Sequence, residues 1–188
     1  MLDAMTRFIA LLRGVNVGGR TIKSAELSDV FRSLGYDSVK TVLASGNVVF
    51  DAEGEASARR ADIEKALSDR FGYDARAHVL ATDALASVID AYPFAARAGW
   101  HRYVVFFIGA TPGGPETQRT AELDSVARDV LDLTLDPELE QTADGGSVVY
   151  WAVERGRTLD SVVGKRLGTA RGKTLTTNRN LNTLEKLL

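Results

Sequence analysis

The chain has 188 residues, of which 45% are hydrophobic and 26% are charged, and its formal net charge is -2. This composition is typical of a folded globular protein, and the length suits one domain or two small ones. A near-neutral charge gives no global basic excess of the kind that nucleic acids and anionic membranes attract. The chain has no cysteine, which excludes disulfides, thiolate catalysis and zinc–sulfur sites.

No apolar run approaches the roughly 20 residues that a membrane-spanning helix needs. The first apolar run, Phe8 to Leu12, is too short for the core of a secretory signal and ends at Arg13. We therefore expect a cytoplasmic protein with no membrane partner.

The first half of the sequence predicts the element order β-α-β-β-α-β. Apolar periodicity and turn residues predict a strand at 6–13, a helix at 24–34, strands at 39–43 and 48–50, a helix at 57–71 and a strand at 75–80. Only four residues, 44–47, link the second and third strands, so these strands form an antiparallel hairpin. This order is that of the ferredoxin-like unit.

The second half repeats the order but lacks a final strand. Its patterns predict a helix at 82–91, a strand at 102–108, a helix at 116–130, strands at 137–141 and 147–153, a helix at 159–167, a polar loop and a helix at 180–188. We therefore expect the first half to supply a neighbour for an incomplete second unit.

The predicted fold class is α+β, with two ferredoxin-like (βαββαβ-type) units that have antiparallel or mixed sheets and pack together, plus a C-terminal helix. We expect one unit at 1–81 and the incomplete unit, with the helix, at 82–188.

A glycine-rich loop, "GVNVGGRT" at 14–21, differs by one letter from the phosphate loop of nucleotide hydrolases. That loop requires Lys where this chain has Arg20, and a guanidinium does not replace a compact ammonium. The predicted hairpin also excludes the all-parallel sheet in which such loops lie. A second near-match, "GTARGKT" at 168–174, is one residue short and follows a helix. The glycines can still present backbone N–H groups to an anion at the start of a helix, or they can simply form a tight turn.

Other kinds of site have little support in the sequence. The two histidines, His78 and His101, have no chelating spacing, so we expect no metal and no cofactor. No Gly-x-Ser-x-Gly motif indicates a serine hydrolase. An RNA-recognition unit would carry a basic-aromatic octapeptide, which is missing here. We expect Trp100, Tyr150 and Trp151 to lie in the core or at an interface.

The C-terminal stretch "TLTTNRNLNTLEKLL" sets Arg179 between two asparagines. The planar fork of an arginine suits a carboxylate or a phosphate. Alternatively, Arg179 pairs with a carboxylate of the protein and docks the last helix. Both ends of the chain are basic, with four Lys or Arg against one acid in residues 1–24 and six against two in residues 160–188. If the ends meet, they form a positive patch.

Three stretches together, "ALLRGVNVGG", "SGNVVF" and "TTNRNLNT", resemble in sequence and order the bacterial domain-of-unknown-function family 1697. The resemblance spans nearly the whole chain. It implies paired ferredoxin-like α+β units and no established activity. One departure is visible, because the family often has Trp where this chain has Leu181. The motif positions are Arg13, Gly14, Asn16, Gly18, Gly19, Ser45, Gly46, Asn47, Arg179, Asn180, Asn182 and Thr183.

These observations lead to one main hypothesis, that the chain is a cytosolic protein binding an anionic ligand. The ligand would be a phosphate-bearing small molecule or a nucleic acid, held where the N-terminal loop, the 45–47 turn and the C-terminal segment converge. The candidate ligand-binding residues are Arg13, Asn16, Gly18, Gly19, Ser45, Asn47, Arg179, Asn180 and Asn182. Two alternatives remain open. The chain can be an enzyme of unknown class that uses Asn47, Arg179 and a carboxylate in a cleft between the halves, or the motifs can be purely structural.

Overall fold

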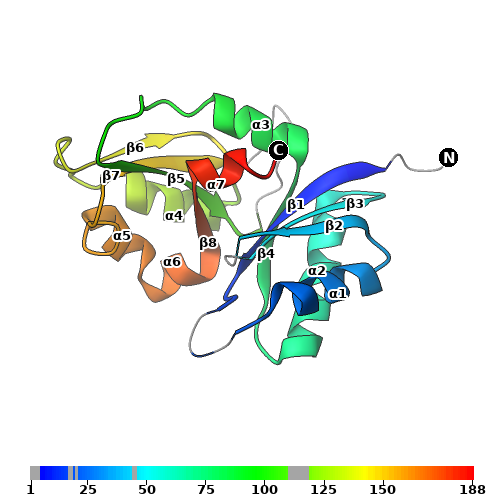
Figure 1. Ribbon diagram of the computed structural model, residues 1–188. Helices are drawn as coiled ribbons and strands as arrows, with labels where there is room; N and C mark the ends of the chain where they lie inside the picture. Colours follow the sequence, from blue (N-terminus) through cyan, green and yellow to red (C-terminus); the bar gives the residue numbers. More distant parts are fainter. Residues whose placement is uncertain (1–4, 17–18, 20, 44–45, 110–118) are drawn as a thin grey trace. The chain divides into compact units, whose positions relative to one another are not determined.

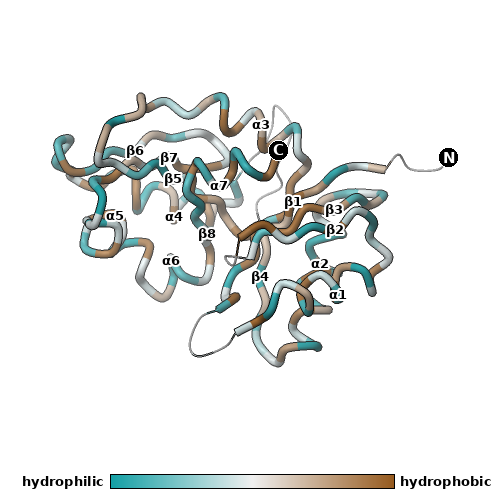
Figure 2. The backbone as a smooth tube through the Cα atoms, in the orientation of Figure 1, coloured by the Kyte–Doolittle hydropathy of each residue, from teal (hydrophilic) through white to brown (hydrophobic). Residues whose placement is uncertain are grey.

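A computed structural model of the chain describes residues 5–16, 19, 21–43, 46–109 and 119–188 (Figure 1). These residues form two four-stranded sheets, both antiparallel, with helices. Figure 2 shows that β1 (Thr6–Arg13) and β3 (Asn47–Ala52) are apolar over most of their length, whereas β2 (Asp37–Val42) is hydrophilic. No helix in the described parts of the chain combines the length and apolar character needed to cross a bilayer.

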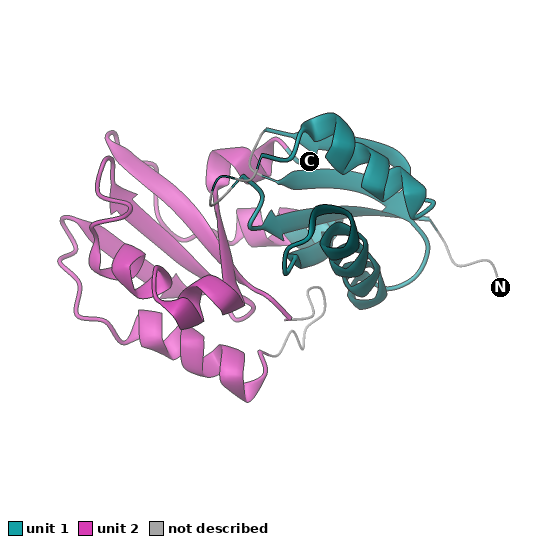
Figure 3. Ribbon diagram, turned by 90° about the horizontal axis from the view of Figure 1, so that it is seen from below, with its two compact units in different colours: residues 1–85, 111–113, 187–188 teal, residues 86–110, 114–186 magenta. Residues whose placement is uncertain are grey.

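The described residues divide into two compact units (Figure 3). Unit 1 contains those up to Leu85, together with Leu187 and Leu188, and unit 2 contains those from Ala86 to Lys186. The division falls within helix α3 (Thr82–Asp90).

Unit 1 has the predicted β-α-β-β-α-β order, which confirms this part of the sequence analysis. Its remaining elements are α1 (Ser24–Ser33), α2 (Ala56–Phe71) and β4 (Arg76–Ala81). The strands lie in the order β2-β3-β1-β4. Every neighbouring pair is antiparallel.

The core of unit 1 lies between one sheet face and the two helices. Alternate residues of β1, Phe8, Ala10 and Leu12, pack with buried side chains of α1 and α2. Side chains alternate across a strand, so the intervening residues face the other side. Both sets are apolar, which is why β1 is buried on both faces.

Unit 2 repeats this architecture. Its elements are β5 (Trp100–Phe107), α4 (Ala121–Leu131), β6 (Glu140–Asp144), β7 (Val148–Glu154), α5 (Val162–Leu167), α6 (Ala170–Leu175), β8 (Thr176–Asn180) and α7 (Leu181–Glu185). The strand order β6-β7-β5-β8 is equivalent to that of unit 1.

The prediction that unit 2 lacks a final strand is wrong. β8 pairs antiparallel with β5 from Thr176 opposite Phe107 to Asn180 opposite Tyr103. Because its sequence, "TTNRN", is polar, apolar alternation gives no sign of a strand. Its backbone pairing with a buried strand makes it extended, and unit 2 therefore completes its own sheet.

Two other boundaries differ from the predictions. The segment expected as a polar loop contains α6, whose first turn is capped by Thr169. β6 starts three residues later than expected, at Glu140, because the N–H groups of Leu139 and Glu140 donate to the carbonyl of Asp136 and form a turn before it. The Glu140 side chain is buried. Its carboxylate accepts hydrogen bonds from the backbone N–H groups of Val162 and Val163, at 2.7 and 3.2 Å, at the start of α5.

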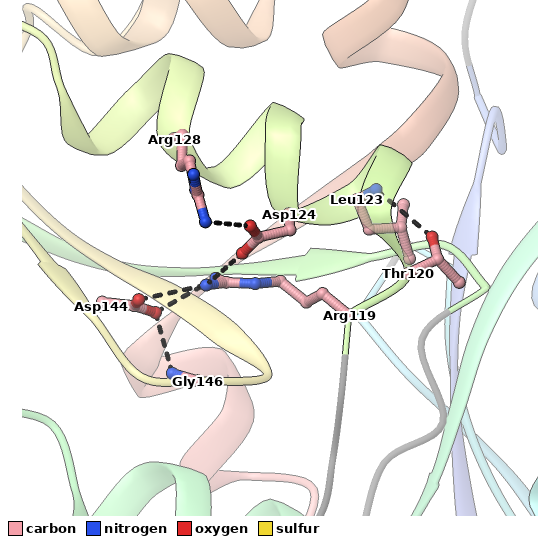
Figure 4. Close-up of polar contacts among 7 residues, drawn as sticks. All are labelled: Arg119, Thr120, Leu123, Asp124, Arg128, Asp144 and Gly146. Atoms are coloured by element: carbon pink, nitrogen blue, oxygen red, sulfur yellow. Dashed lines mark hydrogen bonds and ion pairs between the residues drawn. The ribbon is translucent and has the colours of Figure 1, made fainter.

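An ion-pair cluster joins α4 to the turn between β6 and β7 (Figure 4). Arg119 donates two parallel hydrogen bonds to Asp144, each 3.1 Å long. It also lies 3.3 Å from Asp124, which pairs with Arg128 at 2.9 Å. The Arg119 side chain is only 8% exposed, so its bonds are better shielded from water than those of a surface pair.

Replacing Arg119 should therefore destabilise unit 2. We expect Arg119→Ala to lower the free energy of unfolding by about 2 kcal/mol, since it removes charge-assisted hydrogen bonds of a buried guanidinium. Urea unfolding followed by circular dichroism measures the change. The matched control, Arg128→Ala, removes a 72% exposed partner of the same cluster and should cost less than about 0.5 kcal/mol. Equal effects of the two variants would contradict the structural role of Arg119.

Candidate functional site

Two of the three sequence motifs meet at one end of the unit 1 sheet. Leu11 lies opposite Asn47 in the β1–β3 ladder, and the N–H of Leu12 donates to the carbonyl of Gly46 at 2.8 Å. Gly46 has a φ of 74°, and a Cβ there would come within 3.1 Å of Val15. This position therefore favours glycine for its backbone and for the close approach of the loop. Gly18 and Ser45 lie outside the described residues.

Polar side chains gather at this end on the sheet face opposite the helices. The strand register places Leu11 between Asn47 on β3 and His78 on β4. Asn47 is 0% exposed and His78 is 2% exposed. In the next row, Arg13 lies directly opposite Arg76.

The two arginines carry like charges on directly opposed residues, and the Asp74 carboxylate offsets part of the repulsion at Arg76. Directly opposed residues on antiparallel strands have Cβ atoms about 5 Å apart, and like charges there are destabilising. Burial lowers the pKa of the Arg13 guanidinium, because dehydration disfavours the charged form. Arg76 is exposed and contacts Asp74 at 3.2 Å. An anion placed near both guanidinium groups would be attracted by both.

The asparagines of these motifs have local structural roles. Asn16 has a φ of 58°, and its Oδ1 accepts a hydrogen bond from the N–H of Ile22 at 2.9 Å. Asn47 donates from Nδ2 to the carbonyl of Val42 at 3.0 Å and so closes the β2–β3 hairpin. Gly19, with a φ of 80°, adopts a backbone conformation that glycine favours.

Helix α1 begins at Ser24, as predicted. Its N-cap is Lys23, and the carboxylate of Glu26 accepts the Lys23 N–H at 3.3 Å. A side chain of the helix itself thus binds at its N-terminus, which is one half of a capping box, because the Lys23 side chain has no acceptor for the other half. The helix start therefore adds little to an anion site.

The third motif lies in unit 2, on the edge strand β8. Arg179 is largely buried opposite Val104, and its Nη1 donates to the hydroxyl of Thr177 at 2.7 Å and to the carbonyl of Asn178 at 2.9 Å. The glycine loop belongs to unit 1 and the Arg179 segment belongs to unit 2. The convergence of these two motifs on one ligand therefore stays a prediction.

The other two asparagines of this motif flank the start of α7. Asn180 is its N-cap, and its Oδ1 accepts the N–H of Asn182 at 3.0 Å. The Oδ1 of Asn182 accepts from Nη2 of Arg102 on β5 at 3.4 Å. Asn180 is thus accounted for by helix capping, whereas Asn182 connects the motif to an arginine that the sequence analysis did not select.

The sequence analysis missed Arg76, His78 and Arg102 as parts of polar clusters. Each can be recognised only from the residues that lie opposite it on neighbouring strands, and the sequence of a single strand does not show that register. His78 lies on edge strand β4 and is buried. Within the residues that the structure describes, no three His, Asp or Glu side chains gather as a metal-ligand set.

Each unit is thus an α+β sandwich of one antiparallel sheet with helices, in the strand order of ferredoxin-like proteins. The chain belongs to a family described as protein of unknown function (DUF1697), whose model matches residues 5–137. This confirms the resemblance seen in the sequence. The match includes the first two motifs and ends before the Arg179 segment.

One solved structure supports the fold. The conserved bacterial protein SP0830 from Streptococcus pneumoniae aligns with a TM-score of 0.77 at 22% identity, over 98% of this chain and 97% of that one. An unknown protein from Galdieria sulphuraria aligns over 94% of this chain and 98% of that one at 11% identity. Its TM-score of 0.28 is too low to indicate a shared fold. No relative was found among curated proteins.

Removing the Asn47 side-chain amide should weaken the fold. Asn47→Ala leaves the part-buried carbonyl of Val42 without that donor, so we expect a loss of about 1–3 kcal/mol in the free energy of unfolding. Thermal unfolding measures it. Asn178→Ala, at an exposed position of a strand, serves as the control and should change stability by less than about 0.5 kcal/mol. If Asn47→Ala is as stable as the parent protein, the hairpin role is wrong.

Proposed function

We propose that the protein binds an anionic, phosphate-bearing ligand at the Arg13 end of the unit 1 sheet. We use this name for the sheet end that holds Arg13, Arg76, Asn47 and His78. The observation that supports the proposal is the direct opposition of Arg13 and Arg76, where the glycine-rich loop and the Gly46–Asn47 turn meet.

The chemistry of these side chains favours a phosphate. A guanidinium offers a planar set of donors that matches phosphate oxygens, and two opposed guanidiniums can bind different oxygens of one group. Burial of Arg13 reduces the water that screens its charge, which strengthens attraction to an anion. Such a site attracts a phosphate irrespective of the molecule that carries it.

The structural alternative has support of its own, confined to particular residues. The side chains of Asn16, Asn47 and Asn180 each accept or donate a hydrogen bond that fixes a turn, a hairpin or a helix start. These bonds account for the three asparagines without a ligand. We therefore base the proposal on the arginines.

Equilibrium binding tests the proposal. Isothermal titration of the full chain with inorganic phosphate, a mononucleotide and a single-stranded oligonucleotide, at two salt concentrations, compares the carriers of phosphate. We expect Arg13→Ala and Arg76→Ala each to weaken binding tenfold or more, the effect of losing a charge-assisted hydrogen bond. The matched control is Arg32→Ala, an exposed arginine of α1 that pairs with Asp29. It should bind within about twofold of the parent protein.

Two outcomes decide against the site. If Arg13→Ala and Arg76→Ala bind as the parent protein does, the Arg13 end is not where the ligand lies. If none of the three probes binds, the anion proposal fails. A double-mutant cycle of Arg13→Ala with Arg179→Ala shows through non-additivity whether the two segments act on the same ligand.

A further inference from the structure

A hollow of about 420 Å³ lies on unit 2, away from the α4 side of its sheet. The register aligns Arg102 on β5, Ala152 on β7 and Gln141 on β6 in one row across three strands. The short side chain of Ala152 leaves space between its two longer neighbours. Residues 93–97, which connect α3 to β5, form the rest of the wall.

Flat side chains line one side of the hollow. The guanidinium of Arg97 lies 4.5 Å from the centre of the Trp100 ring, and an ion pair of 2.9 Å with Glu138 holds it there. Phe94, another lining residue, packs edge-on against Tyr92 with ring centres 5.8 Å apart. Stacked indole and guanidinium groups offer planar surfaces of the kind on which aromatic rings bind.

The charge of the lining is positive. Its residues include two arginines and no acid. Arg97 is neutralised by Glu138, but Arg102 makes no ion pair with any described residue. Its one hydrogen bond there is the 3.4 Å contact with Asn182, so most of its donors remain available.

We propose that this hollow binds a planar aromatic ligand that carries a negative charge. The ring lies against the Arg97–Trp100 stack, and the carboxylate or phosphate accepts hydrogen bonds from Arg102. The volume lies within the range of small-molecule sites, near its lower end. This site is independent of the Arg13 end, since it uses other residues of another unit.

The amide of Gln141 gives the site a polar group besides the arginine. Its Nε2 donates to the carbonyl of Pro137 at 3.1 Å, which fixes the side chain. A ring with hydrogen-bonding edges, such as a nucleobase, would therefore gain a fixed polar neighbour that a plain hydrocarbon ring does not use.

The test compares ligands that carry one or both features. The full chain carrying Arg13→Ala, which weakens the separate site at the Arg13 end, is titrated with AMP and 2-naphthoate, which have a ring and a charge, and with adenosine and inorganic phosphate, which have one feature each. We expect AMP and 2-naphthoate to bind at least tenfold more tightly than either single-feature probe. If phosphate and AMP bind with equal affinity, the ring has no role in binding. If adenosine and AMP bind with equal affinity, the charge has no role.

Trp100 reports on the location of the ligand. The chain has two tryptophans, and Trp151 is 1% exposed, so iodide should quench mainly the fluorescence of the half-buried Trp100. Bound AMP should protect this fluorescence from iodide. Binding of AMP with no change in iodide quenching would place the ligand elsewhere and overturn the proposal.

Substitutions separate the charge from the shape. Arg102→Ala should weaken AMP and 2-naphthoate binding tenfold or more, and Arg102→Lys, which keeps the charge but not the fork, should have a smaller effect. Trp100→Leu should weaken both ligands and leave phosphate unaffected. Arg157→Ala, an exposed arginine of unit 2 paired with Glu154, is the matched control and should bind as the parent protein does. Unchanged binding by Arg102→Ala, or no binding of AMP or 2-naphthoate to the parent protein at millimolar concentration, would overturn the proposal.

Discussion

The inner strands β1 and β5 need hydrogen-bonding partners on both edges, and much of the structure depends on this constraint. β1 is buried on both faces, as is the second half of β5. A buried backbone N–H or C=O without a partner costs free energy comparable to a lost hydrogen bond. β1 therefore pairs with β3 and β4, and β5 pairs with β7 and β8. The last of these partners is a polar segment that would have no reason to be extended by itself.

The same pairing brings the functional candidates together. The β1–β4 register sets Arg13 opposite Arg76, and the β5–β7–β6 register aligns Arg102 with Ala152 and Gln141. β8 continues into α7, where Asn182 contacts Arg102. The two proposed sites thus arise from one kind of geometry, in which a cation on a central or edge strand acquires neighbours from distant parts of the sequence.

The sequence predicts those helices and strands whose buried positions carry apolar side chains. The run Phe8 to Leu12 and the run Val48 to Phe50 identify strands because they are apolar, and Gly72 ends α2 in the left-handed conformation. β8 was missed because its burial comes from its neighbour rather than from its own composition.

The site was predictable only in part, for a related reason. The glycine loop meets Gly46 because the β2–β3 hairpin lies beside β1. Both segments can be recognised in the sequence from their glycine and asparagine motifs. Arg76 and Arg102 have no motif, and they become candidates only when the register shows what lies opposite them. The family match identifies relatives of unknown function, so chemistry has to come from these contacts.

Cross-strand proton contacts measured by nuclear magnetic resonance test the central claim most directly. If β5 depends on β8 for its second set of partners, backbone contacts should link Val104 with Arg179 and Phe106 with Thr177, which lie opposite each other. The β5 amides that face β8 should exchange slowly with solvent. Absence of these contacts, with rapid exchange along residues 176–180, would show that the segment is a polar loop and would contradict the account.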